Sequence, residues 1–472
     1  MKDLYFRGGM RLKMDIPVKK NEEYIVNIID NGFEGEGITK IDGFTIFVPN
    51  AIKGEEVKIL IVKVLTSHAY AKLIEIIKKS ENRIEPDCAT YKRCGGCNLR
   101  HLSYDATLDL KQNIVQNLVK KNLKSCVNVN KTWGMGNPYN YRNKLQYPVG
   151  KDKNGNIIVG VFANRTHEII KTDECLIQNK KANEIAKFIV QLAEKYDISV
   201  YDENNQQGLL RHIVIKTGIR TNEIMVILVI NGDSLSYQEN FLNELKNKYN
   251  EIESIVLNIN KKNTNVILGH KNINLLGNGY IKDILGDYYF RISPLSFYQV
   301  NPVQAEALYN IALEGLEITK QDVVFDLYCG IGTISIFASK YAKKVYGVEI
   351  VEQAIKDAKW NSEFNKIENT EFIAGDTEKV IDDLINNKKI IPNIVIVDPP
   401  RKGLDRNTIN NIIKIHPKKI AYISCNPATL VRDLAYLEDM YKIEMIQPVD
   451  MFPWTSHVEC VAVLELKEST QK

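Results

Sequence analysis

The chain has 472 residues, enough for about two to four domains, because a single hydrophobic core rarely grows beyond a few hundred residues. Apolar residues make up 44% and charged residues 25%, which excludes a disordered, collagen-like or coiled-coil chain. The net charge is only +4, but residues 81–180 carry 16 Lys and Arg against 9 Asp and Glu. This excess suggests a polyanion-binding region, although a solvated lysine-rich surface explains it almost as well.

The N-terminal residues alternate charged and apolar side chains and contain no apolar run of signal-peptide length. No later stretch reaches the roughly 18 apolar residues of a membrane span. We therefore expect a cytoplasmic protein without membrane contact, with a flexible segment over residues 1–20. Eight cysteines are too few for a disulfide scaffold in a chain of this length, so each is interpreted separately.

Short β-branched runs separated by glycine turns occupy residues 23–77. This spacing predicts a small barrel of about five strands over residues 21–79. Barrels of this size often bind single-stranded nucleic acid, although the fold alone does not establish that function.

Residues 80–300 form a second region, which we expect to be of mixed α+β structure. It opens with a loop that contains Cys88, Cys94 and Cys97, followed by a predicted amphipathic helix over 105–123. Further helices are predicted near 180–195 and 238–248, between runs rich in Val, Ile and Leu that are typical of buried strands.

From residue 301 onwards, apolar strands alternate regularly with helical segments, and two further strand-like runs close the sequence. Strict alternation predicts a parallel, doubly wound α/β sheet over 301–472, whose ligands bind beyond the carboxyl ends of the strands. This region carries 20 Lys and Arg against 25 Asp and Glu, so its charge is opposite to that of the basic region.

The first of these strands leads into a glycine-containing turn and a helix. Gly330 lets a ligand approach the backbone, and Glu349 follows 19 residues later, the spacing of a ribose-hydroxyl acceptor. Position 335 is Ser where a dinucleotide fingerprint has its third glycine, and Asp326 would oppose a phosphate. A positively charged nucleoside such as S-adenosylmethionine fits better. An ordinary turn followed by an exposed Glu explains the glycines or the Glu349 spacing taken singly, but it explains their combination less well.

The fourth strand ends in Asp398, two prolines and Arg401. Enzymes that methylate exocyclic amines often have a similar Asp-Pro-Pro sequence, but with an aromatic residue where this chain has Arg401. Asp398 could instead accept a hydrogen bond from a base N–H, although a proline that merely ends a strand is common.

Cys425 stands where the fifth strand meets its helix, on the same rim of the sheet. The unpaired N–H groups of a helix start favour a thiolate, so we expect a lowered pKa for Cys425. Thiolate addition to carbon 6 of a pyrimidine makes carbon 5 nucleophilic enough to accept a methyl group. Glu459 could then remove the carbon-5 proton. Cys329 and Cys460 are expected to be inert core residues.

Six motifs together resemble the RNA uracil-5-methyltransferases, most closely the RumA-type enzymes of 23S ribosomal RNA. They are SFYQVN, DLYCGIGT, GVE, DPPRKG, SCNPATLVRD and MFPWTSHVE, in that order over residues 296–459. The resemblance extends to the N-terminal barrel, which is similar to a TRAM domain. It implies 23S ribosomal RNA as the partner, with no obligate protein partner evident.

The resemblance also implies roles for individual residues. Cys425 is the nucleophile and Glu459 the base, while Phe297 stacks on the target uracil near Asp398. The implied S-adenosylmethionine contacts are Gln299, Tyr328, Thr333, Glu349, Asp376 and Asp398.

Four thiolates, from Cys88, Cys94, Cys97 and the distant Cys175, suit either tetrahedral zinc or an iron–sulfur cluster on chemical grounds. Three loop thiols and one core thiol without a metal are the simpler alternative. The resemblance implies a [4Fe-4S] cluster, which we expect to shape the RNA-binding surface, because the proposed reaction has no redox step.

Three other functions are compatible with part of this sequence pattern. The same chemistry on transfer RNA is the nearest alternative, although many transfer-RNA relatives lack both the barrel and the cysteine loop. Cytosine-5 methylation is disfavoured by Arg401, where those RNA enzymes carry a cysteine. A non-catalytic RNA-binding factor on the same scaffold is disfavoured because Cys425, Glu459 and Asp398 are all present.

Overall fold

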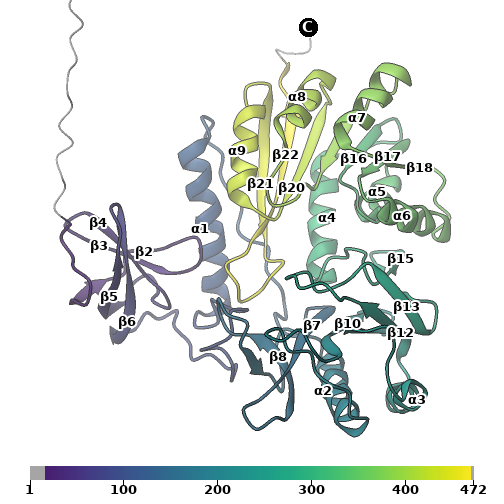
Figure 1. Ribbon diagram of the computed structural model, residues 1–472. Coiled ribbons are helices and arrows are strands. Elements are labelled where there is room, and N and C mark those ends of the chain that lie inside the picture. Colours follow the sequence, from purple (N-terminus) through teal and green to yellow (C-terminus); the bar gives the residue numbers. More distant parts are fainter. Residues whose placement is uncertain (1–15, 469–472) are drawn as a thin grey trace, which may run out of the picture. The chain divides into compact units, whose positions relative to one another are not determined.

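The computed structural model describes residues 16–468, which belong to two compact units (Figure 1). Among the described residues, one unit comprises 16–85 with Asn98–Ala106, and the other Pro86–Cys97 with 107–468. Most of the predicted flexible segment 1–20 lies outside the described residues. In the described part of the chain, no helix is long and apolar enough to cross a membrane.

The first unit is a small β-barrel of six strands in the order β1-β5-β6-β4-β3-β2, one more than the sequence predicts. The extra strand, β2, is only two residues long, too short to leave a hydrophobic pattern. Only β4 and β6 pair in parallel. Ile46, Val57 and Ile59 are buried inside. The strands are β1 Glu23–Asn27, β2 Asp30–Asn31, β3 Gly37–Ile41, β4 Phe44–Val48, β5 Glu56–Val64 and β6 His68–Lys78.

The central part of the second unit is a seven-stranded sheet in the order β13-β12-β11-β10-β7-β8-β9. Helices α2 (Lys180–Lys195) and α3 (Gln238–Lys248) cover one face, where Leu145 and Ile215 belong to their shared core. Both helices have the bounds that periodicity predicts. The strands are β7 Lys144–Lys151, β8 Ile157–Phe162, β9 Ile169–Lys171, β10 Leu210–Thr217, β11 Ile224–Ile230, β12 Ile252–Ile259 and β13 Lys271–Leu276, and a separate hairpin is formed by β14 Ile281–Leu285 and β15 Tyr288–Ile292.

The C-terminal part is a doubly wound α/β sheet in the order β18-β17-β16-β19-β20-β22-β21. Strands β16 to β20 are parallel, and β22 runs antiparallel between β20 and β21. The strands are β16 Val323–Leu327, β17 Lys344–Glu349, β18 Thr370–Ala374, β19 Ile394–Val397, β20 Lys419–Ser424, β21 Tyr441–Val449 and β22 Glu459–Leu466. The helices are α4 Pro302–Leu316, α5 Thr333–Ser339, α6 Glu352–Phe364, α7 Thr377–Asp382, the π-helix Asp383–Asn387, α8 Arg406–Ile415 and α9 Pro427–Leu437.

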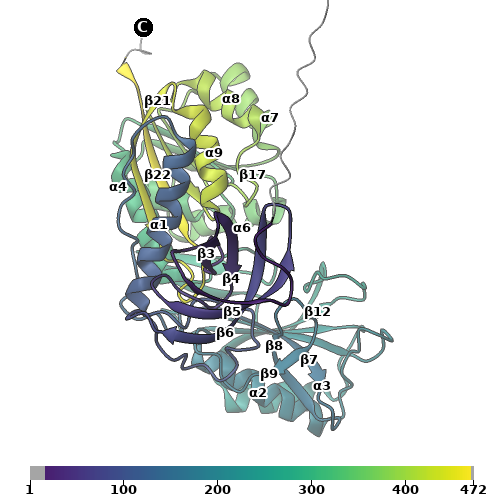
Figure 2. The same ribbon diagram turned by 90° about the vertical axis from the view of Figure 1, so that its left-hand side faces the viewer.

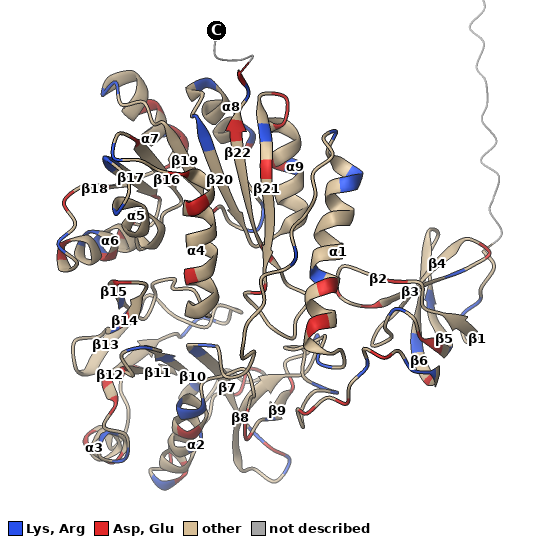
Figure 3. Ribbon diagram, turned by 180° about the vertical axis from the view of Figure 1, so that it is seen from behind, with Lys and Arg blue, Asp and Glu red and all other residues tan. Residues whose placement is uncertain are grey.

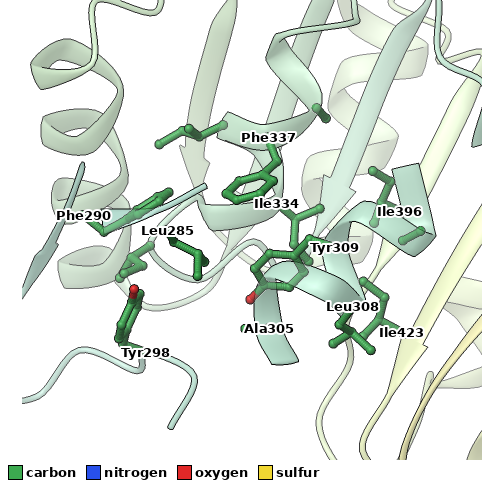
Figure 4. Close-up of a cluster of buried hydrophobic side chains, with 14 of the residues drawn as sticks. Leu285, Phe290, Tyr298, Ala305, Leu308, Tyr309, Ile334, Phe337, Ile396 and Ile423 are labelled. Carbon is green, nitrogen blue, oxygen red and sulfur yellow. The ribbon is translucent and has the colours of Figure 1, made fainter. Parts of the chain in front are cut away.

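One hydrophobic core joins the central sheet to the C-terminal sheet. Figure 4 shows Tyr298 and Phe290 at one side of this core and Ile396 and Ile423 at the other, with Tyr309 of α4 between them. The boundary predicted at residue 300 stays a prediction, because this unit continues across it.

Helix α1 (Tyr104–Asn122) contributes its Thr107–Asn122 part to the second unit, beside β21 and α9 (Figure 2). The chain that follows α1 runs along the outer edge of β21. There the Asn130 N–H donates to the Ile446 carbonyl at 3.0 Å, and the Trp133 N–H to the Pro448 carbonyl at 2.8 Å. Lys111 of α1 forms a buried ion pair with Asp450, just after β21.

Candidate active site

The turn between β16 and α5 leaves its backbone open at the carboxyl end of the sheet. Tyr328, Gly330 and Gly332 have positive φ angles of 68°, 54° and 80°. The N–H groups of Tyr328 and Cys329 donate to the Val348 carbonyl at 2.9 and 3.0 Å, which ties the turn to β17. A Cβ at Gly330 would meet no atom within 4 Å, so a ligand can approach the backbone here.

Two carboxylates predicted as cofactor contacts lie at the carboxyl ends of the neighbouring strands β17 and β18. Glu349 accepts hydrogen bonds from the N–H groups of Gly330 at 3.3 Å and Val351 at 2.9 Å, so its carboxylate is held against the turn. Asp376 caps helix α7 by accepting from the Lys379 N–H at 3.4 Å. Both therefore lie at strand ends on the rim where a doubly wound sheet binds ligands.

Two further predicted contacts lie at this rim. Thr333 is the first residue of α5, and its hydroxyl donates to the hydroxyl of Tyr309 at 3.4 Å. The Tyr328 side chain lies near Thr377 and Thr408, and burial raises its pKa. The structure thus brings the predicted residues from β16, β17 and β18 to one edge of the sheet.

Asp326 also belongs to this site. The sequence indicated only that its negative charge would disfavour a bound phosphate. Asp326 is fully buried, and Ser335 donates to its Oδ2 at 2.5 Å, while no described residue hydrogen-bonds to Oδ1. Burial raises its pKa to about 7. A buried acidic group with a free acceptor suits a ligand that carries positive charge. An Asp inside an otherwise apolar strand was the available signal.

Cys425 and Glu459 are brought together by the pairing of β20 with β22. Ser424 lies opposite Cys460, so the next residue along β20 and the preceding residue of β22 are neighbours. Cys425 is partly exposed, whereas Glu459 is 4% exposed. Asp398 follows β19, the strand on the other side of β20. The predicted nucleophile and base thus share one rim with Asp398.

Burial and mutual repulsion raise the pKa of every acid in this group. Burial and the field of Asp398 raise the pKa of Glu459 to about 8. Burial, followed by the field of Asp326, raises the pKa of Asp398 to about 7. Three carboxyl groups whose pKa values lie so near neutrality form an environment that favours a cationic ligand.

The predicted lowering of the Cys425 pKa is wrong. Burial, followed by the carboxylates of Glu459 and Asp398, raises it to about 11, and the guanidinium of Arg401 offsets only part of this increase. The start of helix α9 offers little compensation, because Pro427 has no N–H and the Asn426 side chain accepts from the Ala428 N–H at 3.1 Å. Cys425 is therefore a protonated thiol at neutral pH in the free protein.

Cys329 and Cys460 are buried, as expected for core thiols, and burial raises the pKa of both.

The segment that carries Phe297 and Gln299 is held by the central sheet. The Asn143 side chain donates to the Gln299 carbonyl at 2.9 Å, and the Asn143 N–H donates to the Val300 carbonyl at 2.9 Å. The Phe297 side chain is 68% exposed. An exposed aromatic ring on an anchored backbone is available for stacking on a base.

The cysteine group draws on two distant stretches of chain. Burial raises the pKa of Cys94 and Cys175, and the nearby thiol of Cys88 raises both further; all four cysteines are partly exposed. The Gly96 N–H donates to the Cys94 sulfur at 3.2 Å. Backbone N–H groups near a sulfur favour the thiolate form.

Four thiolates are the ligand set of either tetrahedral zinc or an iron–sulfur cluster. As placed within residues 16–468, however, no three His, Cys, Asp or Glu side chains have the arrangement of a metal site.

Comparison with protein families adds two matches. The model described as tRNA (Uracil-5-)-methyltransferase matches residues 103–467, and the TRAM domain model matches residues 17–74. Two relatives are each called an uncharacterized RNA methyltransferase. The protein from Clostridium tetani is 47% identical over 96% of this chain and 98% of its own length. That from Clostridium acetobutylicum is 48% identical over 95% and 98%.

Among solved structures, the chain is similar to the tRNA (uracil-54, C5)-methyltransferase of Pyrococcus abyssi in complex with S-adenosyl-L-homocysteine. The TM-score is 0.75 at 27% identity, over 94% of this chain and 100% of that one. The similarity thus extends over both the barrel and the doubly wound sheet.

Proposed function

The chain belongs to the tRNA (uracil-5-)-methyltransferase family and is an S-adenosylmethionine-dependent RNA methyltransferase with a TRAM domain; we propose that it methylates carbon 5 of specific uridines in 23S ribosomal RNA. One observation carries the proposed chemistry: Cys425 and Glu459 are neighbours across β20 and β22, beside Asp398. An RNA substrate of this kind leads us to expect the reaction in the cytoplasm.

In the proposed reaction, the Cys425 thiolate adds to carbon 6 of the uracil, carbon 5 accepts the methyl group, and Glu459 removes the carbon-5 proton so that the thiolate can leave. Because the Cys425 pKa is about 11 in the free protein, a neighbouring carboxylate must take its proton first. Asp398, with a pKa of about 7, is the stronger candidate at neutral pH.

Bound S-adenosylmethionine supplies an electrophilic methyl group on a positively charged sulfur. The residues that would hold it are Gln299, Tyr328, Thr333, Glu349, Asp376 and Asp398. The open backbone at Gly330 and the free Oδ1 of buried Asp326 support this assignment. A cation among these carboxyl groups lowers their pKa values and favours the Cys425 thiolate.

Phe297 stacks on the target uracil in this proposal, and the exposure of its ring supports that role. Cys88, Cys94, Cys97 and Cys175 would hold a [4Fe-4S] cluster, with zinc as the alternative. Protein purified without oxygen should absorb near 400 nm and contain about four irons per chain. A colourless protein that contains zinc would refute the cluster.

Transfer RNA is the second candidate substrate, and a specific observation favours it. The similar P. abyssi enzyme is a tRNA methyltransferase, and the match covers 94% of this chain, so the barrel by itself does not separate the two substrates. A further possibility, an RNA-binding or assembly factor without activity, is opposed by the intact reactive group.

The experiment compares unmodified 23S ribosomal RNA with unmodified transfer RNA as substrates of the purified protein and labelled S-adenosylmethionine. We expect 5-methyluridine in the 23S RNA. Product in transfer RNA alone would overturn the substrate assignment, and product in neither would overturn the function. Cys425→Ala should abolish product, whereas Glu459→Gln should accumulate a covalent protein–RNA adduct. Activity retained in Cys425→Ala would refute the covalent mechanism.

A further inference from the structure

Two lysines of the central sheet lie directly opposite each other on neighbouring strands. Lys144 of β7 pairs with Lys216 of β10, so both side chains emerge from the same face of the sheet. Val214, two residues before Lys216, belongs to the core shared with the C-terminal sheet, which identifies this face as the one toward the candidate active site. Like charges at directly opposite positions destabilise a sheet. Figure 3 colours the Lys and Arg positions of the described chain blue.

Neither lysine has a carboxylate partner among the described residues. Lys216 is 6% exposed, and its ammonium donates to the carbonyls of Ser293 at 2.7 Å and Ser296 at 3.0 Å. The acidic residue that affects its pKa is Asp357. The Asp357 Oδ1 lies 3.8 Å from the Arg291 Nε, and the Ser293 hydroxyl donates to the Asp357 carboxylate at 3.2 Å.

The other buried lysines of the same unit differ in this respect. Lys111 is paired with Asp450, and Lys419 with Glu317. A buried charge is normally compensated by such a partner, because desolvation is costly. Lys216 and the half-buried Lys144 are the exception, and burial lowers the pKa of both, that of Lys216 to about 7.

Both lysines line a small cavity beside Phe297. Its other walls include Asn143, Thr217 and Ser296, and its volume is about 30 Å³. That is room for about two water-sized groups, which matches the two unbridged oxygens of a phosphodiester. The exposed Phe297 ring, which we propose to stack on the target uracil, forms part of the rim.

We propose that this cavity binds a backbone phosphodiester of the RNA next to the target uridine. The proposal rests on the proposed function, since it assumes an RNA substrate whose base meets Phe297. Lys144 supplies a free ammonium for the anion. Lys216 holds the carbonyls of Ser293 and Ser296, and so links phosphate binding to the position of the Phe297 segment. A second source of an anion is the carboxylate of S-adenosylmethionine, which the experiment separates.

The main variant is Lys144→Met, which removes the charge, keeps the length of the side chain and changes a partly exposed residue. Lys187→Met is the matched control, because Lys187 is exposed on α2, on the opposite face of the sheet. Both are compared with the wild type in binding an unmodified 23S RNA fragment at several salt concentrations, and in binding S-adenosyl-L-homocysteine.

Lys144→Met should weaken RNA binding on the order of tenfold and reduce the slope of log affinity against log salt by about 0.7 to 1, as for one lost phosphate contact. Its affinity for S-adenosyl-L-homocysteine should not change, and Lys144→Arg should restore most of the RNA affinity. A methylphosphonate placed next to the target uridine should weaken wild-type binding but cause no further loss in Lys144→Met.

Unchanged RNA affinity and salt slope in Lys144→Met would overturn the proposal. So would a loss of S-adenosyl-L-homocysteine binding with RNA binding intact, because the anion would then belong to the cofactor. Failure of the proposed function gives a different result: the wild type would make no 5-methyluridine, whatever the effect of Lys144→Met on RNA affinity.

Discussion

Replacement of Glu459 by Gln should flatten the dependence of folding stability on pH. Glu459 is 4% exposed, and its pKa is raised from 4.5 to about 8, chiefly by burial. The native state therefore keeps this proton at pH values where the unfolded chain has lost it. The resulting stabilisation is complete below about pH 4.5 and is lost as the pH rises through about 8.

The magnitude follows from the shift. One pKa unit corresponds to 1.36 kcal/mol, so this group alone lowers the free energy of unfolding by roughly 3 kcal/mol between pH 6 and pH 9. Gln cannot ionise, so the variant should lack this loss and gain stability relative to the wild type as the pH rises.

Equilibrium urea unfolding, followed by circular dichroism at pH 6, 7, 8 and 9, measures this difference. Glu465→Gln is the matched control, because it makes the same change on the same strand at a partly exposed position. It should leave the wild-type pH dependence almost unaltered. Parallel curves for the wild type and Glu459→Gln would refute the assigned burial of a neutral Glu459.

Three further outcomes are expected. First, kcat/KM should rise from pH 6 to pH 9, because Cys425 and Glu459 act only after losing protons that their raised pKa values retain; a profile that falls over this range would contradict both roles. Second, Lys111→Met should lower the free energy of unfolding by about 3 to 5 kcal/mol in the same urea assay, because it breaks a buried ion pair. Its control is Lys124→Met, which breaks the exposed pair with Asp439 and should lower the free energy of unfolding by less than about 1 kcal/mol. Third, Phe297→Ala should raise KM for RNA by roughly tenfold or more, because stacking on the base is lost, and its urea unfolding should be unchanged. Phe364→Ala is the control, because Phe364 is an exposed aromatic residue on α6. Equal KM values for the two variants would argue against stacking.

Local patterns predicted the elements well, because they depend on residues close together in the chain. Helix α2 has the predicted bounds 180–195, and Glu349 ends its strand as the spacing indicated. The same local signal could not reveal that Lys144 lies opposite Lys216, since strand pairing joins segments some seventy residues apart. Register emerges only from the packed sheet.

The ionisation of Cys425 illustrates a second limit. Its own helix, visible in the sequence, predicted a lowered pKa, but the dominant influences are burial and two carboxylates from other strands. The first turn of a helix that begins with Pro427 lowers the pKa of a nearby thiol less than desolvation raises it. The environment of a reactive group depends on which strands become neighbours in the sheet. Secondary-structure propensity does not specify this strand order.

The position of β22 has a consequence for the time course of folding. It is the last of the described strands to leave the ribosome, yet it is inserted between β20 and β21, which are made earlier. Until Glu459–Leu466 is synthesised, β20 has an open edge, β21 has no partner on that side, and Cys425 has no Glu459 carboxyl group beside it. Closure of the sheet and the placing of Glu459 beside Cys425 are thus one late event in the synthesis of this part of the chain.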